Sequence, residues 1–399
     1  MPRALVLYAT DLSPRSEIAP GGITNILRSC LEYLPSEWEV DVWGAVISGA
    51  ETCDRPVLLG SREVWFRPIV QAAPITRRRV PLSLAYCLAL AARHRRGEIS
   101  ASRYDLVVAH RTDYVAALRT ATRRRLLPPV LAVIHGSSEF APRTMGMAKR
   151  WLYLFGERAA LKTAQRVALV SRSALSYYRA FYRQLPSHRF AWLPNAVDQS
   201  VFRPGDRVVA RESLNVPLDA QVFTYHGRLE HEKGIDRLVA TIRRIAESNP
   251  DALFFIVGAG RLGRWTAEHA SQPPLAGRVR LFGFRAPHQV AALLQASDVS
   301  LLCSRFEGMS VGLLESLACG VPVVATDVGD NRLVLSMVDA DLVVPPDPCA
   351  IAPRAAQVAA TRQALTSRAV QVAAQFSVQR RARRVADLWS AVAANQGTL

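Results

Sequence analysis

Two cations lie in the loop that follows a predicted strand at residues 222–226. A rigid guanidinium at Arg228 and a flexible ammonium at Lys233 can together hold a diphosphate. Arginine outnumbers lysine 47 to 3, and Lys233 is the only lysine after position 162, which indicates that a compact point charge is needed there. The alternative interpretation is a set of solvated loop charges that Glu230 and Glu232 offset.

A second predicted strand, at residues 299–304, ends in a loop that carries a carboxylate and leads into a helix. The helix is expected to start near Ser310 and to end at Gly320. Amides at a helix start attract phosphate, and carboxylates accept hydrogen bonds from sugar hydroxyls. Glu307 in the loop and Glu315 on the otherwise apolar helix therefore predict a nucleotide site with sugar hydroxyls at the carboxylates.

Further candidates lie in the first half of the chain. Gly21 and Gly22 precede a helix that we expect to begin near Asn25, so backbone amides there could contact a phosphate. A plain turn is the alternative, and the Gly-x-Gly-x-x-Gly fingerprint of dinucleotide-binding loops is not expected after this strand or any other. His135 ends another predicted strand, where it is either a functional group or a hydrogen-bonded strand-end residue.

Short apolar stretches alternate with longer helical ones on both sides of residue 200, which predicts two doubly wound α/β domains. The other predicted strands are residues 4–9, 40–46, 106–110, 130–135 and 167–171 in the first half and residues 253–258, 279–282 and 321–326 in the second. Turn-forming residues at 193–205 place the domain boundary at 198/199. Ligands of parallel sheets lie beyond the carboxyl ends of the strands, so we expect the two domains to face each other across a cleft.

The composition describes an ordinary globular protein of 399 residues, of which 50% are hydrophobic and 21% are charged. The longest apolar run, residues 80–92, is interrupted and falls short of the ~20 residues that cross a bilayer. The N-terminal residues 1–12 read as a strand rather than a signal peptide, so a cytoplasmic location is expected. The six cysteines show no Cys-x-x-Cys pair, which predicts buried reduced thiols without zinc or disulfides.

The formal net charge of +17 belongs mainly to the first half of the chain. Residues 1–200 hold 28 Lys and Arg against 15 Asp and Glu, whereas residues 201–399 hold 22 against 18. Arginine clusters lie at 77–79, 93–96 and 123–125, and the first two bracket an apolar segment, residues 81–92, that is predicted to be an amphipathic helix. This pattern favours an anionic membrane surface. Solvated faces produced by arginine-rich codon usage are the alternative, and nucleic acid is disfavoured because no aromatic residues alternate with the clusters.

Taken together, the motifs of the second half resemble the retaining glycosyltransferases of family 4. The motifs that carry this resemblance are Gly227-Arg228, Lys233-Gly234, Gly258-Ala259-Gly260, Phe282-Gly283-Phe284, the pair Glu307 and Glu315 with seven residues between them, and residues 318–326. Weaker counterparts in the rest of the chain are the Gly-Gly loop, His135-Gly136, residues 194–198 and Phe376-Ser377. The resemblance therefore covers nearly the whole chain.

The resemblance implies a GT-B fold, with the donor held mainly by the second domain, residues 199–377. It also implies that the last helix, at about 378–399, crosses back to the first domain, residues 1–198. The site roles that it implies are the donor diphosphate for Arg228 and Lys233, sugar hydroxyls for Glu307, the ribose for Glu315, supporting amides for Ser310, Val311, Gly312 and Leu313, the base for Phe284 and Gly258, the phosphates for Gly21 and Gly22, and the transferring sugar for His135.

The activity implied by the resemblance is transfer of a sugar, with retention, from a nucleotide-diphosphate sugar to a hydroxyl. UDP- or GDP-sugars are the expected donors, without a metal or other cofactor, and no Asp-x-Asp carboxylate pair is expected in the chain. No residue is assigned as a general base. The expected acceptor is a saccharide or lipid-linked saccharide in bacterial cell-surface polysaccharide or glycolipid assembly. Two alternatives stay open: a nucleotide-sugar 2-epimerase of the same fold, and a non-catalytic nucleotide-sugar-binding protein.

Overall fold

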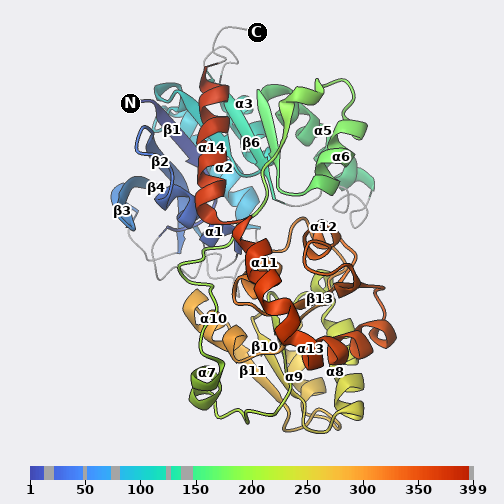
Figure 1. Cartoon of the computed structure of the whole chain (residues 1–399). Coiled ribbons are helices and arrows are strands. Elements are labelled where there is room, and N and C mark those ends of the chain that lie inside the picture. The colour runs from blue at the N-terminus through green and yellow to red at the C-terminus, as the bar shows by residue number, and fades with distance from the viewer. Residues whose placement is uncertain (13–21, 48–51, 73–80, 123–126, 136–146, 395–399) are drawn as a thin grey trace. The chain divides into compact units, whose positions relative to one another are not determined.

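A computed structural model describes residues 1–12, 22–47, 52–72, 81–122, 127–135 and 147–394 of the chain. The chain divides into two compact units, one formed by Met1–Pro194 with Val378–Leu399 and the other by Asn195–Ser377 (Figure 1). In each unit, helices pack against one sheet of mainly parallel strands.

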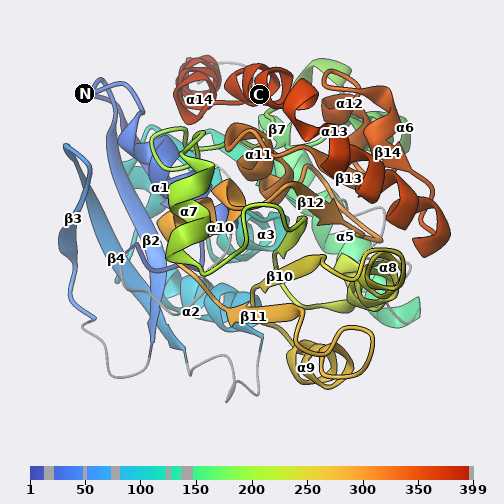
Figure 2. The ribbon, with the colours of Figure 1, turned by 60° about the horizontal axis from the view of Figure 1, so that its bottom comes forward.

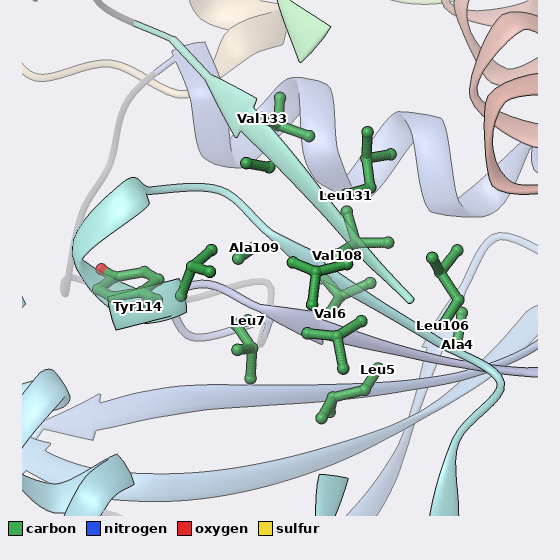
Figure 3. Close-up of a cluster of buried hydrophobic side chains, with 14 of the residues drawn as sticks. Ala4, Leu5, Val6, Leu7, Leu106, Val108, Ala109, Tyr114, Leu131 and Val133 are labelled. Atoms are coloured by element: carbon green, nitrogen blue, oxygen red, sulfur yellow. The ribbon is translucent and has the colours of Figure 1, made fainter. Parts of the chain in front are cut away.

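The first unit contains an eight-stranded sheet in the order β3-β4-β2-β1-β5-β6-β7-β8, in which β3 pairs antiparallel with β4 and the other described strands pair in parallel. Apolar side chains of the central strands form a buried core together with Tyr114, as Figure 3 shows. The strands are β1 (Arg3–Leu7), β2 (Glu39–Ile47), β3 (Arg55–Leu59), β4 (Arg62–Ala72), β5 (Leu106–Ala109), β6 (Val130–Ile134), β7 (Arg166–Leu169) and β8 (Phe190–Trp192).

The longer helices of the first unit form two packed groups. Helix α3 packs between α2 and α5, whereas α1 packs against α14, which also contacts β5 and β6. The helices are α1 (Gly22–Glu32), α2 (Leu82–Arg95), α3 (Thr112–Ala121), α5 (Met147–Thr163), α6 (Arg172–Phe181) and α14 (Val378–Ala393). Because α14 belongs to the first unit, the last helix returns to it as the sequence analysis predicts.

The second unit contains a six-stranded parallel sheet in the order β11-β10-β9-β12-β13-β14. Its strands are β9 (Val222–His226), β10 (Leu253–Val257), β11 (Val279–Gly283), β12 (Val299–Leu302), β13 (Val323–Thr326) and β14 (Val343–Val344). Its helices are α7 (Arg207–Ser213), α8 (Ile235–Ser248), α9 (Gly263–Ala270), α10 (Pro287–Gln295), α11 (Val311–Ala318), α12 (Asn331–Leu335) and α13 (Pro348–Ala374). Since β9 and β12 are parallel neighbours, the loops after them leave the sheet side by side.

The chain passes between the two units twice, between Pro194 and Asn195 and between Ser377 and Val378. These passages lie together, because the Val197 amide donates to the Phe376 carbonyl over 2.9 Å and Val197 forms a parallel bridge with Ser377. The two ends of the second unit are therefore adjacent.

The ten predicted strands are confirmed, with ends that shift by up to two residues. Strands β3, β4, β8 and β14 were not predicted. Polar and proline residues interrupt the apolar pattern of the β3–β4 hairpin, and β8 and β14 have only three and two residues. Helix α1 begins at Gly22 rather than near Asn25, so the second glycine is its first helical residue.

The amphipathic character expected for residues 81–92 is wrong. Helix α2 does form there, but it carries apolar residues on two sides, because Tyr86 and Leu90 are buried whereas Leu84 and Leu88 are exposed. The cluster at 93–96 ends this helix, and the clusters at 77–79 and 123–125 lie outside the described residues. No helix among the described residues is long and apolar enough to cross a bilayer.

The cysteine prediction is partly wrong. All six cysteines are free, and Cys30, Cys303 and Cys319 are buried as expected. Cys53 and Cys349 are exposed, however, because they lie in the segment before β3 and in the first turn of α13. Local sequence does not distinguish these loop and helix-end positions from core positions.

Candidate functional site

The loops after β9 and β12 contact each other in the second unit. The Arg305 amide donates to the Glu232 carbonyl over 2.9 Å. Gly234 has a φ of +65° and packs so closely that a Cβ atom there would lie 2.0 Å from the Cys303 carbonyl oxygen. Glycine therefore serves both the left-handed backbone and the close approach that joins the two loops.

Lys233 and Glu307 form an ion pair between these loops. The Nζ of Lys233 donates to Oε1 of Glu307 over 2.7 Å, and the hydroxyl of Ser304 donates to the same oxygen over 2.7 Å. The Glu307 side chain is only 6% exposed, and a carboxylate taken out of water needs such partners. The two groups that the resemblance assigns to different parts of the donor are thus bonded to each other in this structure.

Arg228 makes different contacts. Its Nη2 lies 3.0 Å from Oε1 of Glu232, and its side chain is 60% exposed. The buried Tyr225 hydroxyl donates to the Arg228 carbonyl over 2.8 Å, which fixes the backbone at the start of the loop. The guanidinium is therefore held at the surface beside one of the two carboxylates that the sequence suggests could offset it.

Glu315 pairs with a residue that the sequence analysis did not single out. Its Oε2 lies 3.0 Å from Nε2 of His226, the last residue of β9, and both side chains are mostly buried. A Cβ atom at Gly312 would lie 3.0 Å from that same Nε2, so the glycine leaves room for the imidazole. Nδ1 of His226 is buried and has no partner among the described residues. The position of His226 directly before Gly227-Arg228 was the signal that could have identified it.

The start of α11 is fixed from three directions. The hydroxyl of Ser310 accepts a hydrogen bond from the Leu313 amide over 3.3 Å, which makes Ser310 the N-cap. The Asn195 side-chain amide donates to the Met309 carbonyl over 2.8 Å, and the Asp330 amide donates to the Gly308 carbonyl over 2.9 Å. These bonds position the first amides of a helix, which have no acceptor within that helix. Val311 and Gly312 supply such amides.

Gly258, Ala259 and Gly260 lie beside the Arg228 loop. The expectation that no strand is followed by Gly-x-Gly-x-x-Gly is wrong, because residues 258–263 match this spacing and follow β10. Their close approach is to protein, however: a Cβ atom at Gly258 would lie 1.8 Å from the Gly227 carbonyl oxygen, and one at Gly260 would lie 2.3 Å from that of Leu229. Phe284 follows β11 and is 57% exposed, so its ring is available to a planar ligand.

The candidates of the first unit form a separate group. His135 follows β6, and its Nε2 lies 2.8 Å from Nδ1 of His110 at the end of β5. The two rings stack with centroids 5.1 Å apart, and Nδ1 of His135 is buried without a partner among the described residues. Gly22 begins α1, and Gly21 lies outside the described residues.

Comparison with known protein families identifies the family of the chain. Residues 206–371 match the family model described as Glycosyl transferases group 1, and residues 20–201 match the model described as Glycosyltransferase Family 4. The chain belongs to the group 1 glycosyltransferases. The family resemblance of the sequence motifs is thereby confirmed, and it extends over both units.

Curated relatives of this group 1 glycosyltransferase match parts of the chain. A D-inositol 3-phosphate glycosyltransferase of Stackebrandtia nassauensis is 37% identical over 34% of this chain and 33% of its own length. A UDP-Gal:alpha-D-GlcNAc-diphosphoundecaprenol alpha-1,3-galactosyltransferase of Escherichia coli is 28% identical over 60% of this chain and 62% of its own length. The chain thus spans a third to just under two thirds of these relatives.

Solved structures confirm the fold of the group 1 glycosyltransferase. A sucrose-phosphate synthase of Thermosynechococcus elongatus superposes with a TM-score of 0.81 over 99% of this chain and all of that one, at 21% identity. The predicted GT-B class, with two Rossmann-like α/β units, is therefore confirmed.

The expectation that this group 1 glycosyltransferase has no Asp-x-Asp pair is wrong, because Asp339 and Asp341 have this spacing, which could bind a divalent cation. Asp339 and Asp341 lie at a short 3-10 turn, where Asp339 accepts a hydrogen bond from the Asp341 amide over 2.9 Å. The other oxygen of Asp339 pairs with Arg354 over 3.2 Å. Asp339 therefore has a structural role as a turn cap and a partner of α13.

The histidine pair predicts how the stability of the group 1 glycosyltransferase depends on pH. Burial, and then the charge of Arg381, lower the pKa of His110 to about 3, and burial also lowers the pKa of His135. The unfolded chain binds these protons near pH 6.5, whereas the folded chain does not, so the stabilising effect is complete above pH 6.5 and is lost as the pH falls. From pH 8 to pH 5, His110 alone should lower the free energy of unfolding by about 2 kcal/mol.

Denaturant unfolding at pH 8 and pH 5 measures this effect. The variant His110→Asn keeps a polar side chain without the titration, so its unfolding free energy should fall less between the two pH values. Equal pH dependence in the variant and the parent protein would contradict the assignment.

Proposed function

We propose that this chain transfers a sugar, with retention of anomeric configuration, from a nucleotide-diphosphate sugar to a hydroxyl of a saccharide or lipid-linked saccharide. The observation that carries the proposal is the junction of the β9 and β12 loops, where the pair Lys233–Glu307 lies beside the start of α11. An ammonium, a helix start and a buried carboxylate are the groups that a phosphorylated sugar requires.

The pair Lys233–Glu307 prepares the site for donor. Without ligand, the ammonium compensates a carboxylate that is 6% exposed, and Ser304 holds the same carboxylate oxygen. In the proposed complex, the donor phosphates share Lys233, while Glu307 accepts hydrogen bonds from sugar hydroxyls. Lys233 is 20% exposed, so it can reach a ligand while it stays close to Glu307.

A second pair is proposed to hold the nucleoside. Glu315 is assigned to the ribose hydroxyls, and Nε2 of His226, 3.0 Å away, orients the carboxylate. Phe284 and Gly258 are proposed to flank the base, and Arg228 to add charge at the diphosphate. The name of the Escherichia coli relative specifies UDP-galactose, which supports a uridine nucleotide among the candidate donors.

Electrostatics supplies the proposed chemistry. The bond between the anomeric carbon and the leaving phosphate oxygen breaks, and a bond from that carbon to the acceptor oxygen forms on the same face. The acceptor proton passes to the leaving phosphate, so no side chain is needed as a general base. Lys233 and the amides at Val311 and Gly312 stabilise the charge that develops on the phosphate, and in this proposal no metal is required.

The acceptor is proposed to be lipid-linked or membrane-proximal, in assembly of bacterial surface polysaccharide or glycolipid at the cytoplasmic face of the membrane. Positions 1–200 hold 28 basic residues and only 15 acidic ones, and this positive charge supports the assignment. The Escherichia coli relative is named for a diphosphoundecaprenol-linked acceptor, which supports it further.

A thermal-shift screen with nucleotide sugars tests the proposal, because a ligand that binds only the folded chain raises the melting temperature. At a concentration of about 100 times Kd, the donor should stabilise the fold by about 2.7 kcal/mol. The selected donor is then incubated with an acceptor panel, and nuclear magnetic resonance reads the anomeric configuration of the product. Conversion of the donor without acceptor would support the epimerase instead, and binding without turnover across the panel would support a non-catalytic protein.

A further inference from the structure

Helix α5 presents three large apolar side chains to solvent. Met147, Trp151 and Phe155 are 80%, 74% and 75% exposed. They are spaced by four residues, so they form one stripe along the helix. Contiguous exposed apolar residues of this size are unusual on a protein surface and indicate a binding surface.

Two cations extend the same stripe. At about 100° per residue, Met147, Trp151, Phe155, Arg158 and Lys162 fall within an arc of about 80° on the helix surface. Arg158 and Lys162 are exposed, and neither forms an ion pair with a described carboxylate. The stripe therefore changes from apolar at its start to cationic at its end.

The side of α5 next to this stripe and behind it faces the interior. Ala160 and Leu161 are fully buried, and Glu157 is buried where the Tyr178 hydroxyl donates to it over 2.6 Å. The orientation of the stripe toward solvent is thus fixed by the packing of the other side of the helix.

Helix α2 repeats this arrangement. Leu84 and Leu88 are 50% and 62% exposed, and with the exposed Arg95 they fall within an arc of about 40°. Tyr86 and Leu90 anchor the helix on its buried side. Here too the apolar residues precede the cation along the helix.

Helices α2 and α5 belong to one layer, because α3 packs against both (Figure 2). Both helices return the chain to the start of a strand, β5 after α2 and β7 after α5, and these strands lie in the parallel part of one sheet. The two helices therefore run in the same direction, with their apolar starts at one end of the layer and their cations at the other.

The acidic residues near this layer are neutralised. Asp113 pairs with Arg111 over 2.9 Å, Glu98 pairs with Arg96 over 2.6 Å, and Glu157 is buried. Among the described residues of α2, α3 and α5, the exposed charges outside ion pairs are therefore cations, which suits an anionic surface.

We propose that this surface, defined by Leu84, Leu88, Arg95, Met147, Trp151, Phe155, Arg158 and Lys162 and called the α2–α5 face, docks on an anionic lipid bilayer. Trp and Phe insert at the level of the headgroups, and the cations bind lipid phosphates. A second copy of the chain is a poorer occupant, because a two-fold contact would place two surfaces of the same positive charge against each other. The docking deepens the membrane-proximal acceptor of the proposed function, but it does not depend on the sugar chemistry.

Co-sedimentation with vesicles tests the α2–α5 face. Phosphatidylcholine vesicles with roughly 30% phosphatidylglycerol should bind the protein at least about tenfold more tightly than pure phosphatidylcholine vesicles. The measurement is made at about 0.01 M salt, where screening is weak. Each removed cation should weaken binding about fivefold, so the double variant Arg158→Gln/Lys162→Gln should bind about 25-fold more weakly.

The double variant Trp151→Gln/Phe155→Gln should lose at least about tenfold in vesicle binding with an unchanged melting temperature. The matched control is Val209→Gln, at a 61% exposed apolar position of α7, which should bind vesicles like the parent protein. Equal binding to both vesicle types, or parent-like binding by both double variants, would overturn the proposal. A dimer that only the Trp151/Phe155 variant loses would assign the face to self-association instead.

The same variants separate docking from catalysis. Transfer to a short water-soluble saccharide acceptor should continue at the parent rate in every variant of the α2–α5 face. If the parent protein transfers sugar but does not bind vesicles, docking is refuted and the proposed function stands. If it binds vesicles but does not transfer sugar, the proposed function is refuted and docking stands.

Discussion

Replacing Lys233 or Glu307 by alanine is expected to reduce the rate of sugar transfer by about a thousandfold, or ~4 kcal/mol. Lys233→Ala removes the positive charge at the proposed leaving phosphate. Glu307→Ala removes a buried carboxylate that accepts two hydrogen bonds. The variant Glu307→Gln keeps the side-chain shape and an oxygen for Ser304 but removes the charge, so it should also be severely impaired. Steady-state kinetics with the donor from the thermal-shift screen measures these effects.

The control for this pair is Arg264→Ala. Arg264 is a 92% exposed residue of α9 that pairs only with the surface residue Glu268 among the described carboxylates, so its loss should leave kcat and KM unchanged. Circular dichroism and melting temperature show whether each variant is folded. Full activity in folded Lys233→Ala and Glu307→Ala proteins would refute the site.

Gly234→Ala is expected to have the largest effect on stability, with a loss of at least about 3 kcal/mol in the free energy of unfolding. The added Cβ would lie 2.0 Å from the Cys303 carbonyl oxygen, and that neighbour is backbone that cannot rotate away. Relief of the clash requires separation of the two site loops, so a partly folded variant should also lose donor binding. Denaturant unfolding and the donor thermal shift measure the two effects.

Gly277→Ala is the matched control for the backbone conformation. Gly277 has a φ of +76°, similar to that of Gly234, but a Cβ atom there meets nothing within 4 Å. Its replacement should lower the free energy of unfolding by only about 1 kcal/mol, which is the cost of a left-handed backbone for a residue with a Cβ atom. Similar losses in the two variants would show that the approach to Cys303 contributes nothing.

Sequence was sufficient for the elements that depend on local pattern. The apolar runs that form β9 and β12 are continuous because the strands of a parallel sheet are buried on both faces. Ser310 as N-cap and Gly320 after the helix predicted the ends of α11, since capping is also a local property. The location of the candidate site follows from these strand ends.

Contacts between distant residues could not be predicted in this way. His226 and Glu315 are 89 residues apart, and their pairing depends on β9 being the neighbour of β12, an order that periodicity does not specify. The bond between Lys233 and Glu307 has the same origin. The exposed face of α2 was also missed in detail, because an apolar sequence does not reveal which leucines lack a neighbour.

The adjacency of the two passages at Pro194–Asn195 and Ser377–Val378 has a consequence for how the protein is assembled. In covalent terms, the second unit is one uninterrupted segment inserted into the first unit, whose own chain resumes with α14. Because the ends of this segment are adjacent, a homologous segment from a related protein could replace it without stretching either junction. Truncation before α14, in contrast, would remove a part of the first unit rather than a tail.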